Sequence, residues 1–578
     1  MPTRGGSVHV VTTRRHYKDK VYQTILLRRS YREGGKVKTQ TVGNLSHLPP
    51  EAITAIRQVL KGEQLVVAGT TAEIGRSLPH GHVALVWQAA RQLGLPALLG
   101  PPGRQRDLAM ALIVARVLRP ASKLATTRWW HDTTLAEDLG VAGASTDEVY
   151  AAMDWLGQQQ DHIQRQLARR HLQSGGLAYY DLSSSYVEGR HCQLAARGYS
   201  RDQKVGKDQI EYGLLTDPQG RPVAVEVFGG NTADPTAFTA VVERVRDRFG
   251  LKRLVLVGDR GMITSARVEA LRGLEGMGWI TCLRADKIRQ LATDGPLQLG
   301  LFDEHNLAEI SHPDFPGERL VCCRNPALAA ERARKRAELL AATEAELDKV
   351  TRLVEAGKVK GAAKIGVRVG KVVGRFKVAK HFDLQITDTS FAWTRREDQI
   401  AAEAALDGIY VVRTSVAADQ LDSPGVVEAY KRLANVERDF RSLKTVDLEL
   451  RPIHHWRDGR VRAHVLACML ACYLVWHLRR ALAPLCFTDQ APPQRTDPVA
   501  PAQRSADAAA KASRRQLADG TPTHSFRSLL DHLGTLTRNQ VHFTPQPHAV
   551  TTQLLATPTP TQRRAFELVG APIPLTLK

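Results

Sequence analysis

The stretch Leu177-Ala-Tyr-Tyr-Asp181 is an apolar run that predicts a β-strand ending on an acidic residue. A second run of the same kind, Leu254-Val-Leu-Val-Gly-Asp259, ends on another aspartate. Between them the sequence predicts strands over 209–216 and 222–228, followed by a helix that stops at Gly250. This order of three strands, a helix and a return strand predicts one sheet whose first and fourth strands each end on a carboxylate.

A third carboxylate, Glu437, lies in a segment of strong helical character that runs from Tyr430 to Lys444. Tyr430, Glu437 and Lys444 are spaced by seven residues, which is close to two turns, so they share one helix face. Apolar residues of the same segment form a stripe that can pack on the sheet: Leu433, Val436, Phe440 and Leu443. Each acid alone also fits an ordinary role, as a turn residue or as an exposed helix residue in an ion pair.

Three carboxylates brought to one point by two strands and a helix can hold a pair of Mg²⁺ ions. Two such ions about 3.5–4 Å apart activate an attacking hydroxyl and stabilise the leaving oxygen in phosphoryl transfer. The three acids taken together therefore predict an enzyme that cuts or joins phosphodiesters.

The composition is strongly basic, with 80 Lys and Arg against 59 Asp and Glu and a formal net charge of +21. Residues 1–50 hold ten Lys or Arg and two acids, and residues 351–380 hold nine and one. Basic blocks of this kind fit a polyanion partner, because neutralising phosphates releases condensed counterions. The alternative for either block alone is a solvated basic surface.

Seven cysteines in 578 residues, with no C-x-x-C pair, do not resemble a disulfide scaffold or a zinc site. They fit a reducing cytoplasm. The N-terminus lacks the apolar core of a signal peptide. The longest apolar stretch, Val465 to Trp476, is shorter than the ~20 residues needed to span a bilayer, so it predicts a buried helix and no membrane partner.

A chain of this length is expected to fold as several modules. Residues 7–45 alternate apolar and polar positions around Gly34-Gly35, which predicts a small basic β-rich module. Later segments switch between helical periodicity, the predicted sheet and a stretch rich in Pro, Ala, Gln and Ser. The expected organisation is a basic β-rich module (1–75), a helical region that could contain a DNA-reading helix-turn-helix (76–172), a catalytic core in two parts (173–285 and 405–480), a basic inserted domain (286–404), and a linker with a C-terminal tail (481–578).

The order Tyr-Tyr-Asp181-Leu-Ser-Ser-Ser-Tyr, Gly-Gly-Asn231-Thr-Ala-Asp234, Val-Gly-Asp259-Arg-Gly-Met and Tyr430…Arg432…Glu437…Lys444 resembles the DDE-type transposases of bacterial insertion sequences. The resemblance is to the branch with a Tyr-Arg-Glu-Lys signature, and it covers roughly 173–475 and touches the basic start at Ser30–Lys36. It implies an α/β fold: a ribonuclease H-like mixed sheet with helices on both faces, interrupted by an inserted domain and preceded by a basic β-rich and helical DNA-binding region.

The resemblance implies two Mg²⁺ ions, with Mn²⁺ as an alternative, bound by Asp181, Asp259 and Glu437. It also implies that Tyr430 and Lys444 contact DNA. The chain departs from the signature at its arginine: Arg432 is five residues before the glutamate and about 140° around the helix from it. Either Arg432 reaches around the helix, or Arg441, one turn after Glu437, takes that role.

Other polar residues carry weaker expectations. Lys204 and Lys207 lie in a basic turn where DNA contact and plain solvation are equally expected. Asn231 and Asp234 match a family feature, but Asp234 before Pro235 more simply predicts a helix start. Three histidines lack metal-ligand spacing and are expected to be structural or DNA-facing: His454, His455 and His464.

The resemblance implies a transposase that binds the terminal inverted repeats of its own element, cleaves a strand and directs the freed 3′-hydroxyl at target DNA. Its partners would be double-stranded DNA, both element ends and target, and a second copy of the chain in a synaptic dimer. It would act in the bacterial cytoplasm, on the nucleoid when DNA-bound. Two alternatives stay open: a catalytically inactive DNA-binding derivative, and a ribonuclease H-like nuclease without strand transfer.

Overall fold

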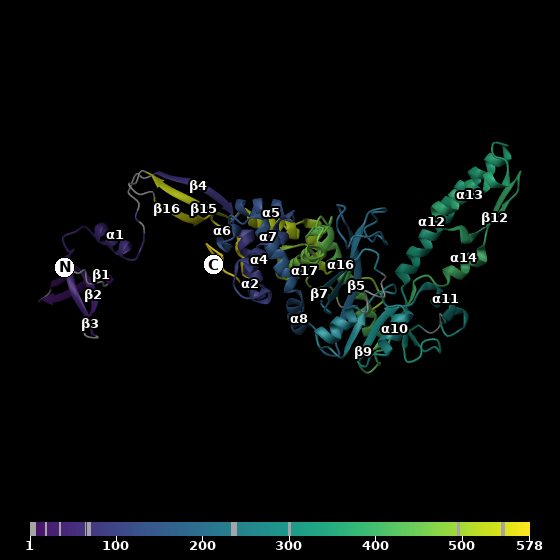
Figure 1. Cartoon of the computed structure of the whole chain (residues 1–578), viewed down its shortest axis with the longest axis horizontal. Coiled ribbons are helices and arrows are strands. Elements are labelled where there is room, and N and C mark those ends of the chain that lie inside the picture. The colour runs from purple at the N-terminus through teal and green to yellow at the C-terminus, as the bar shows by residue number, and fades with distance from the viewer. Residues whose placement is uncertain are drawn as a thin grey trace. The chain divides into compact units, whose positions relative to one another are not determined.

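The computed structural model describes residues 7–17, 20–33, 36–63, 65, 71–232, 240–298, 302–303, 305–493, 497–544 and 550–577. The expected turn at Gly34-Gly35 and the expected helix start at Asp234-Pro235 lie outside these residues. Contacts divide the chain into two compact units (Figure 1). The first comprises Met1–Leu78 with Thr537–Thr557, and the second comprises Pro79–Leu536 with Pro558–Lys578.

The first unit contains two small three-stranded sheets. The chain opens with β1 (Ser7–Tyr17), β2 (Lys20–Glu33) and β3 (Lys36–Asn44), which pair in that order, and α1 (Pro50–Leu60) packs on β1. None of the described residues of these strands is fully buried, because α1 supplies a single buried side chain, Ile53. The second sheet has the order β16-β15-β4 and is built from β4 (Thr71–Pro79), β15 (Thr537–Thr544) and β16 (Val550–Leu555). Part of the segment expected as a C-terminal tail thus folds with the N-terminal region.

The second unit begins with a block of helices, in agreement with the predicted helical region. The helix that begins at Thr146 is capped by Ser145, whose hydroxyl accepts from Glu148 N at 3.2 Å, while Ser145 N donates to the Glu148 carboxylate at 2.9 Å. The helices are α2 (Gly81–Gln92), α3 (Leu95–Leu99), α4 (Arg104–Leu118), α5 (Lys123–Trp129), α6 (Leu135–Leu139), α7 (Thr146–Gln158) and α8 (Gln160–His171).

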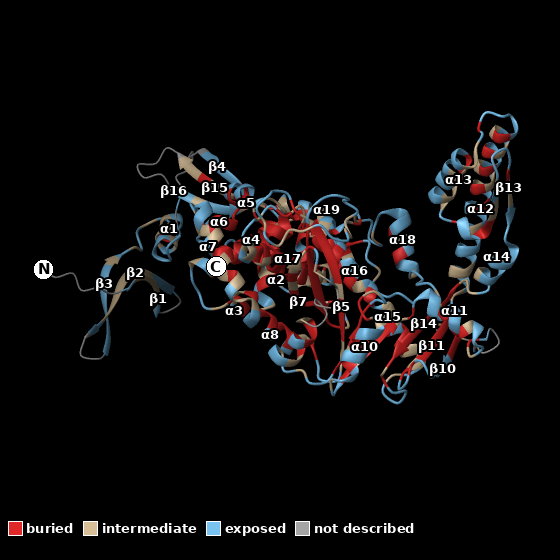
Figure 2. Ribbon diagram, turned by 45° about the vertical axis from the view of Figure 1, so that its right-hand side comes forward, coloured by how far each residue is buried: buried red, intermediate tan, exposed pale blue. Residues whose placement is uncertain are grey.

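One long helix, α17 (Asp458–Ala481), packs on α4 and α7 and also on strand β7 of the sheet. It is long and apolar enough to cross a bilayer, but 83% of its apolar window is buried within the protein. Figure 2 shows this helix among the most deeply buried elements. The prediction of a buried helix over Val465–Trp476 is confirmed.

The centre of the second unit is an eight-stranded mixed sheet of order β10-β11-β14-β9-β8-β5-β6-β7. β8 runs parallel to both β5 and β9, and all other neighbours are antiparallel. The strands are β5 (Leu177–Tyr186), β6 (Gln209–Thr216), β7 (Pro222–Gly229), β8 (Leu254–Val257), β9 (Met277–Cys282), β10 (Leu307–Ile310), β11 (Arg319–Arg324) and β14 (Ile409–Thr414).

The sheet differs from the prediction in two places. β5 does not end at Asp181 but continues to Tyr186, because residues 182–186 pair with β6. β10 and β11 lie inside the range expected for the inserted domain, yet they extend the sheet through β14. The strands that were expected over 209–216 and 222–228 are present, and Gly250 has a φ of 70° after the preceding helical turn.

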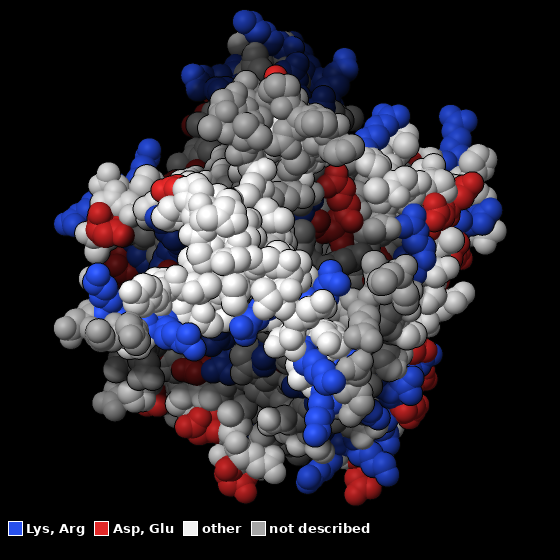
Figure 3. Space-filling model, turned by 90° about the vertical axis from the view of Figure 1, so that its left-hand side faces the viewer, with Lys and Arg blue, Asp and Glu red and all other residues white. Residues whose placement is uncertain are grey.

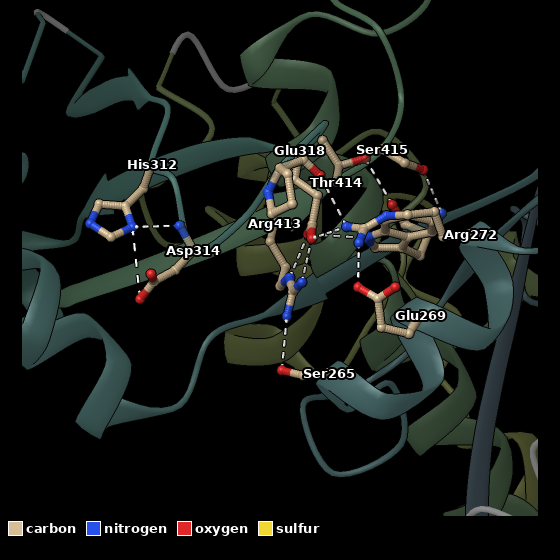
Figure 4. Close-up of polar contacts among 11 residues, drawn as sticks. Ser265, Glu269, Arg272, His312, Asp314, Glu318, Arg413, Thr414 and Ser415 are labelled. Carbon is tan, nitrogen blue, oxygen red and sulfur yellow. Dashed lines mark hydrogen bonds and ion pairs between the residues drawn. The ribbon is translucent and has the colours of Figure 1, made fainter.

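A buried ionic network joins β9, β11 and β14 to α10 (Ser265–Arg272), as Figure 4 shows. The Glu318 carboxylate, 1% exposed, accepts hydrogen bonds from both Arg413 and Arg272, and from Trp279 Nε1 at 3.2 Å. Thr414 Oγ1 donates to Trp279 O at 2.8 Å across the neighbouring strand pair. Because a buried carboxylate is stable only when its oxygens are paired, this network fixes the strands beside one another.

The segment between β11 and β14 forms a separate layer with its own core. It consists of α12 (Pro326–Glu355), α13 (Ala362–Phe376), β12 (Phe382–Ile386), β13 (Phe391–Arg395) and α14 (Glu397–Ala404). Leu340, Leu347 and Ile365 belong to this core, which is distinct from the cluster that packs under β11 and β14. The inserted layer therefore spans fewer residues than the predicted range 286–404, and most of its residues are exposed (Figure 2).

The last part of the second unit is more ordered than a linker and tail. It forms α18 (Ala506–Arg514), α19 (Phe526–Gly534) and α20 (Pro560–Val569), and both α19 and α20 pack on α2. These helices are too short for their apolar periodicity to stand out in the sequence. Each has a hydroxyl N-cap, from Ser505, Ser525 and Thr559 respectively.

Candidate active site

Asp181 and Asp259 line one cavity of about 440 Å³. Asp181 lies on β5 and Asp259 two residues beyond β8, and the two strands are parallel neighbours. In their register Leu177 pairs with Val255 and Tyr179 with Val257, so two more residues on each strand bring the two aspartates level. The strand pairing itself therefore brings together two acids that are 78 positions apart in the chain.

Asp181 is a buried acid with other carboxylates near it. Burial, followed by the charges of Asp259 and Glu437, raises the pKa of Asp181 to about 7, although a backbone hydrogen bond from Leu182 N (2.8 Å) and the Arg201 charge act in the opposite direction. The charge of Glu437 is the smallest of these effects. The structure brings Asp181 and Asp259 into one cavity, whereas Glu437 is not among the residues that line it.

Asp259 is held by the turn that follows it. Its Oδ1 accepts from Met262 N at 2.6 Å, and its carbonyl accepts from the N–H groups of Met262 and Ile263. The residue is exposed. The turn thus holds one oxygen of a carboxylate that remains accessible to a ligand.

Glu437 reaches the site from a helix. It lies on α16 (Leu433–Arg441), which packs on β5 and follows α15 (Ser423–Lys431) with only Arg432 between them. Val436 and Phe440 are buried, and the Phe440 ring lies 5.8 Å from that of Tyr212 on β6. Glu437 itself is exposed, because the apolar stripe turns toward the sheet.

The residues of the cavity suit a hard divalent cation, which prefers carboxylate oxygens. Burial and the neighbouring Asp259 charge raise the pKa of Asp181, and a bound cation would act against both effects. In the described part of the chain no three His, Cys, Asp or Glu side chains form a group that could hold one metal ion. The three carboxylates would therefore have to draw closer to share ions.

Tyr430 lies at the end of α15 and faces the sheet. Burial raises the pKa of its hydroxyl, and the nearby Cys282 and Asp259 raise it further, while Arg260 lowers it. The Tyr430 side chain is only partly exposed. It therefore lies beside Asp259, on the side of the site where DNA contact was expected.

The two arginine candidates differ in their surroundings. Arg432 Nη2 lies 3.6 Å from Glu428 Oε2, and its charge also acts on the Tyr179 hydroxyl next to the site. Arg441 is exposed at the C-terminal end of α16, one turn after Glu437. Neither is turned into the core, so both stay candidates for DNA contact.

Lys444 does not lie on the same regular helix as Glu437, because residues Ser442–Val446 form a π-helical turn. Its Nζ lies 2.7 Å from Asp202 Oδ1, and the side chain is 11% exposed. Burial lowers the pKa of Lys444, and the ion pair with Asp202 acts against that shift. The Lys444 charge is therefore committed to Asp202 rather than presented on open surface.

The loop between β5 and β6 carries Lys204 and Lys207, which are both exposed. The Lys204 ammonium lies 5.8 Å from the centre of the Tyr186 ring. Tyr199 and Val205 of the same loop are 79% and 95% exposed. These two lysines lie on the loop that borders the carboxylate cavity, since Gly198, Tyr199 and Arg201 line it.

Sequence reasoning missed two charged residues of the cavity, Arg201 and Glu211. Arg201 Nη1 lies 3.3 Å from Glu211 Oε1, and Arg201 N donates to Ser184 Oγ on β5 at 2.9 Å. The next residue, Asp202, accepts from Tyr186 N and pairs with Lys444 and Arg451. A single arginine in a loop gives no periodic signal, so only the fold reveals this position.

Asn231, which matched the family feature, lines the cavity next to Gly230 and Thr232. Its partner in the motif, Asp234, lies outside the described residues. The histidines are more remote from it. The rings of His455 and His464 lie with their centres 5.1 Å apart at a tilt of 57°, and burial lowers the pKa of His455 to about 3. Both are neutral structural residues, whereas His454 is exposed.

The excess positive charge is spread over the surface. On the face drawn in Figure 3, Lys and Arg side chains form several separate groups with Asp and Glu between them. In the inserted layer, four basic residues spaced by four, three and four positions lie exposed along α13: Lys364, Arg368, Lys371 and Arg375. This spacing places them on one helix face.

Two family models match this chain. Residues 10–70 match the model described as IS1634 family transposase, N-terminal domain, and residues 180–474, just over half of the 578 residues, match the model described as Transposase DDE domain. No curated protein matches the chain. Among solved structures, a piggyBac transposase synaptic complex with hairpin DNA, determined by cryo-EM, is 9% identical and has a TM-score of 0.34 over 78% of this chain and 76% of that one. This similarity is too distant to support a statement about this chain.

Proposed function

Because the chain belongs to the DDE transposases of insertion sequences, we propose that it cuts the ends of its own element and joins them to target DNA at the site of Asp181, Asp259 and Glu437. The observation that supports this proposal is the cavity that Asp181 and Asp259 share on two parallel neighbouring strands, with Glu437 on a helix that packs on β5. Metal-dependent phosphodiester chemistry needs such a set of oxygen ligands.

We propose further that the core is ribonuclease H-like. The order β7-β6-β5-β8-β9, with an antiparallel start and parallel β5, β8 and β9, supports this assignment. Strands β14, β11 and β10 extend that core on the β9 side. The inserted layer then leaves the core between β11 and β14, before the helix that carries Glu437.

Asp181, Asp259 and Glu437 would hold two Mg²⁺ ions, or Mn²⁺ in their place. When bound, such ions lower the pKa of an attacking water or 3′-hydroxyl and neutralise charge on the leaving oxygen. The chain's own residues orient this site. Met262 N fixes one oxygen of Asp259, Leu182 N fixes one oxygen of Asp181, and Val436 and Phe440 anchor the helix that presents Glu437.

DNA is the proposed partner, both as the element's terminal inverted repeats and as target. Candidate contacts on the second unit are Tyr430, Arg432, Arg441, Lys204 and Lys207, which surround the carboxylate cavity or lie exposed beside it. The basic sheet of β1, β2 and β3 falls within the match to the N-terminal domain model and is proposed to read the ends. Two ends must be held together, so a dimer in a synaptic complex is proposed.

The test uses a duplex that carries the inverted repeat flanking the gene, a supercoiled target plasmid, and Mg²⁺. The account predicts strand cleavage at the repeat, followed by covalent joining of the 3′ end to the plasmid. Cleavage with no joined product would favour a nuclease that lacks strand transfer. Binding with no cleavage under any divalent ion would favour an inactive DNA-binding derivative.

A further inference from the structure

A second hollow adjoins the carboxylate cavity. It is also about 440 Å³ in volume and shares Asp259 and Gly261 with the first. Its other walls come from Arg260, Arg284 and Ala285. Asp259 thus stands between two hollows, and the second one contains two arginines and a single acid.

The strand topology places the two arginines side by side. β8 and β9 are parallel neighbours in which Val257 pairs with Ile280, and Gly258 N donates to Ile280 O at 3.2 Å. Arg260 follows the end of β8, and Arg284 follows the end of β9. Adjacent strands lie roughly 4.8 Å apart, so both side chains leave the same edge of the sheet. Crevices outside the carboxyl ends of parallel strands are frequent ligand sites.

Both guanidinium groups are available for a ligand. Each side chain is exposed, and neither makes an ion pair with a carboxylate in the part of the chain that the structure describes. By contrast, Arg272 and Arg413, from nearby elements, are both paired with Glu318. The Arg260 charge also acts on the hydroxyl of Tyr430, so it lies on the side of Asp259 that faces α15.

We propose that this hollow binds a backbone phosphate of the DNA strand whose neighbouring phosphate enters the carboxylate cavity. Arg260 and Arg284 donate hydrogen bonds to its non-bridging oxygens, and the bond at this phosphate is not broken. Guanidinium groups suit this role because their donor geometry matches phosphate oxygens. The inference rests on the proposed function, since it assumes that a DNA strand crosses Asp259 from one hollow to the other.

The binding test uses end duplexes in which one phosphate at a time, on either side of the cleaved bond, is replaced by a neutral methylphosphonate. Affinity is measured for the wild type, for Arg260→Ala/Arg284→Ala, and for Arg289→Ala, whose side chain lies exposed on α11 (Ala285–Thr293) outside the hollow. We expect the neutral phosphate at one position to weaken binding about tenfold in the wild type and in the control. The double variant should bind the unmodified duplex about tenfold more weakly than wild type does. Its affinity should not fall further when the phosphate at that position is made neutral.

The salt dependence gives an independent reading. Loss of the contact to this one phosphate should reduce the slope of log affinity against log salt by about 0.9, and Arg260→Lys/Arg284→Lys should keep most of that slope. The inference fails if the double variant, with an unchanged melting temperature, binds as tightly as wild type or responds to every neutral phosphate as wild type does. This test measures binding and does not need cleavage. If the wild-type protein binds the duplex but never cuts it, the proposed function is wrong, but the affinities still show whether the hollow binds a phosphate.

Discussion

Asp181 is an acid of the candidate site whose ionisation is disfavoured. Its pKa is raised by burial and by two neighbouring carboxylates, so the folded chain without metal holds the Asp181 proton more tightly than the unfolded chain does. The resulting contribution to stability is full below pH 3.8 and is lost as the pH rises through about 7. Above that pH the acid destabilises the fold that positions it.

The substitution Asp181→Asn should therefore raise the melting temperature at pH 8 in the absence of divalent ions, by roughly 2 °C or more. It should have little effect at pH 4, where the native carboxyl is protonated. Calorimetric scans at both values check this, with Asp419→Asn at an exposed loop position as the control. If the Asp181→Asn protein is no more stable than wild type at pH 8, the ionised Asp181 carboxylate does not destabilise the fold.

Lys123 gives a second prediction at the residue scale. Burial lowers its pKa to about 7, with the Arg116 charge acting in the same direction, and its Nζ lies 3.3 Å from His464 Nδ1. The unfolded chain keeps the proton up to pH 10.5, so the free energy of unfolding should rise with pH from about 7 toward 10.5. Lys123→Met should flatten that rise between pH 7 and 9 in urea titrations, whereas Lys364→Met on exposed α13 should not. An unaltered rise in Lys123→Met would rule out the buried amine as its source.

The sequence allowed the three acids to be found because each follows a strongly patterned segment, and those segments form strands or a helix here. It did not allow Arg201 or Glu211 to be found, because Arg201 lies on a loop and Glu211 on β6, and only the tertiary fold brings them together at the cavity. It also placed Lys444 on an open helix face, since spacing alone cannot reveal the buried partner Asp202. The sequence pattern predicts which helix or strand carries a side chain, whereas the partner of that side chain depends on the tertiary fold.

At the scale of elements, the ionic network around Glu318 is the most specific prediction. Glu318→Ala would leave Arg413, which is 6% exposed at the side chain, without its buried partner. Breaking a buried pair in this way costs about 3 kcal/mol or more in the free energy of unfolding. Glu269→Ala removes the exposed carboxylate that also contacts Arg272 and should cost under about 1 kcal/mol. Equal effects of the two substitutions on urea unfolding would show that the network does not join the strands.

Element boundaries were predicted less well than element types. β6 begins and ends at the predicted residues 209 and 216, but β5 continues past Asp181 because β6 supplies partners for polar residues such as Ser183. The strands β10 and β11 escaped prediction because short apolar runs do not distinguish sheet from insertion. The helices after residue 500 were not predicted because they are also short.

At the scale of the whole molecule, the inserted layer should be separable from the sheet. Arg324 and Ile409 are paired directly across β11 and β14, and the layer between them has its own core. Replacing residues 325–408 by an Asn-Gly hairpin turn should therefore leave the remaining chain folded. Circular dichroism should show a cooperative transition within a few degrees of wild type.

The matched control joins Arg324 to Tyr410 through the same turn. This shifts the register of β14 by one residue and turns its buried side chains to the other face, so this protein should be much less stable. If both deletions unfold alike, the inserted layer is required for the sheet.

The most direct test of the central claim is single-turnover cleavage of the end duplex in Mg²⁺ by wild type, Asp181→Asn, Asp259→Asn and Glu437→Gln. Each substitution preserves shape and removes one charge from the proposed metal site. The account predicts that all three variants bind the duplex within a few-fold of wild type and cleave it at least about 1,000-fold more slowly, a loss of ~4 kcal/mol in the barrier. Cleavage by any one of them at a rate near that of wild type would contradict it.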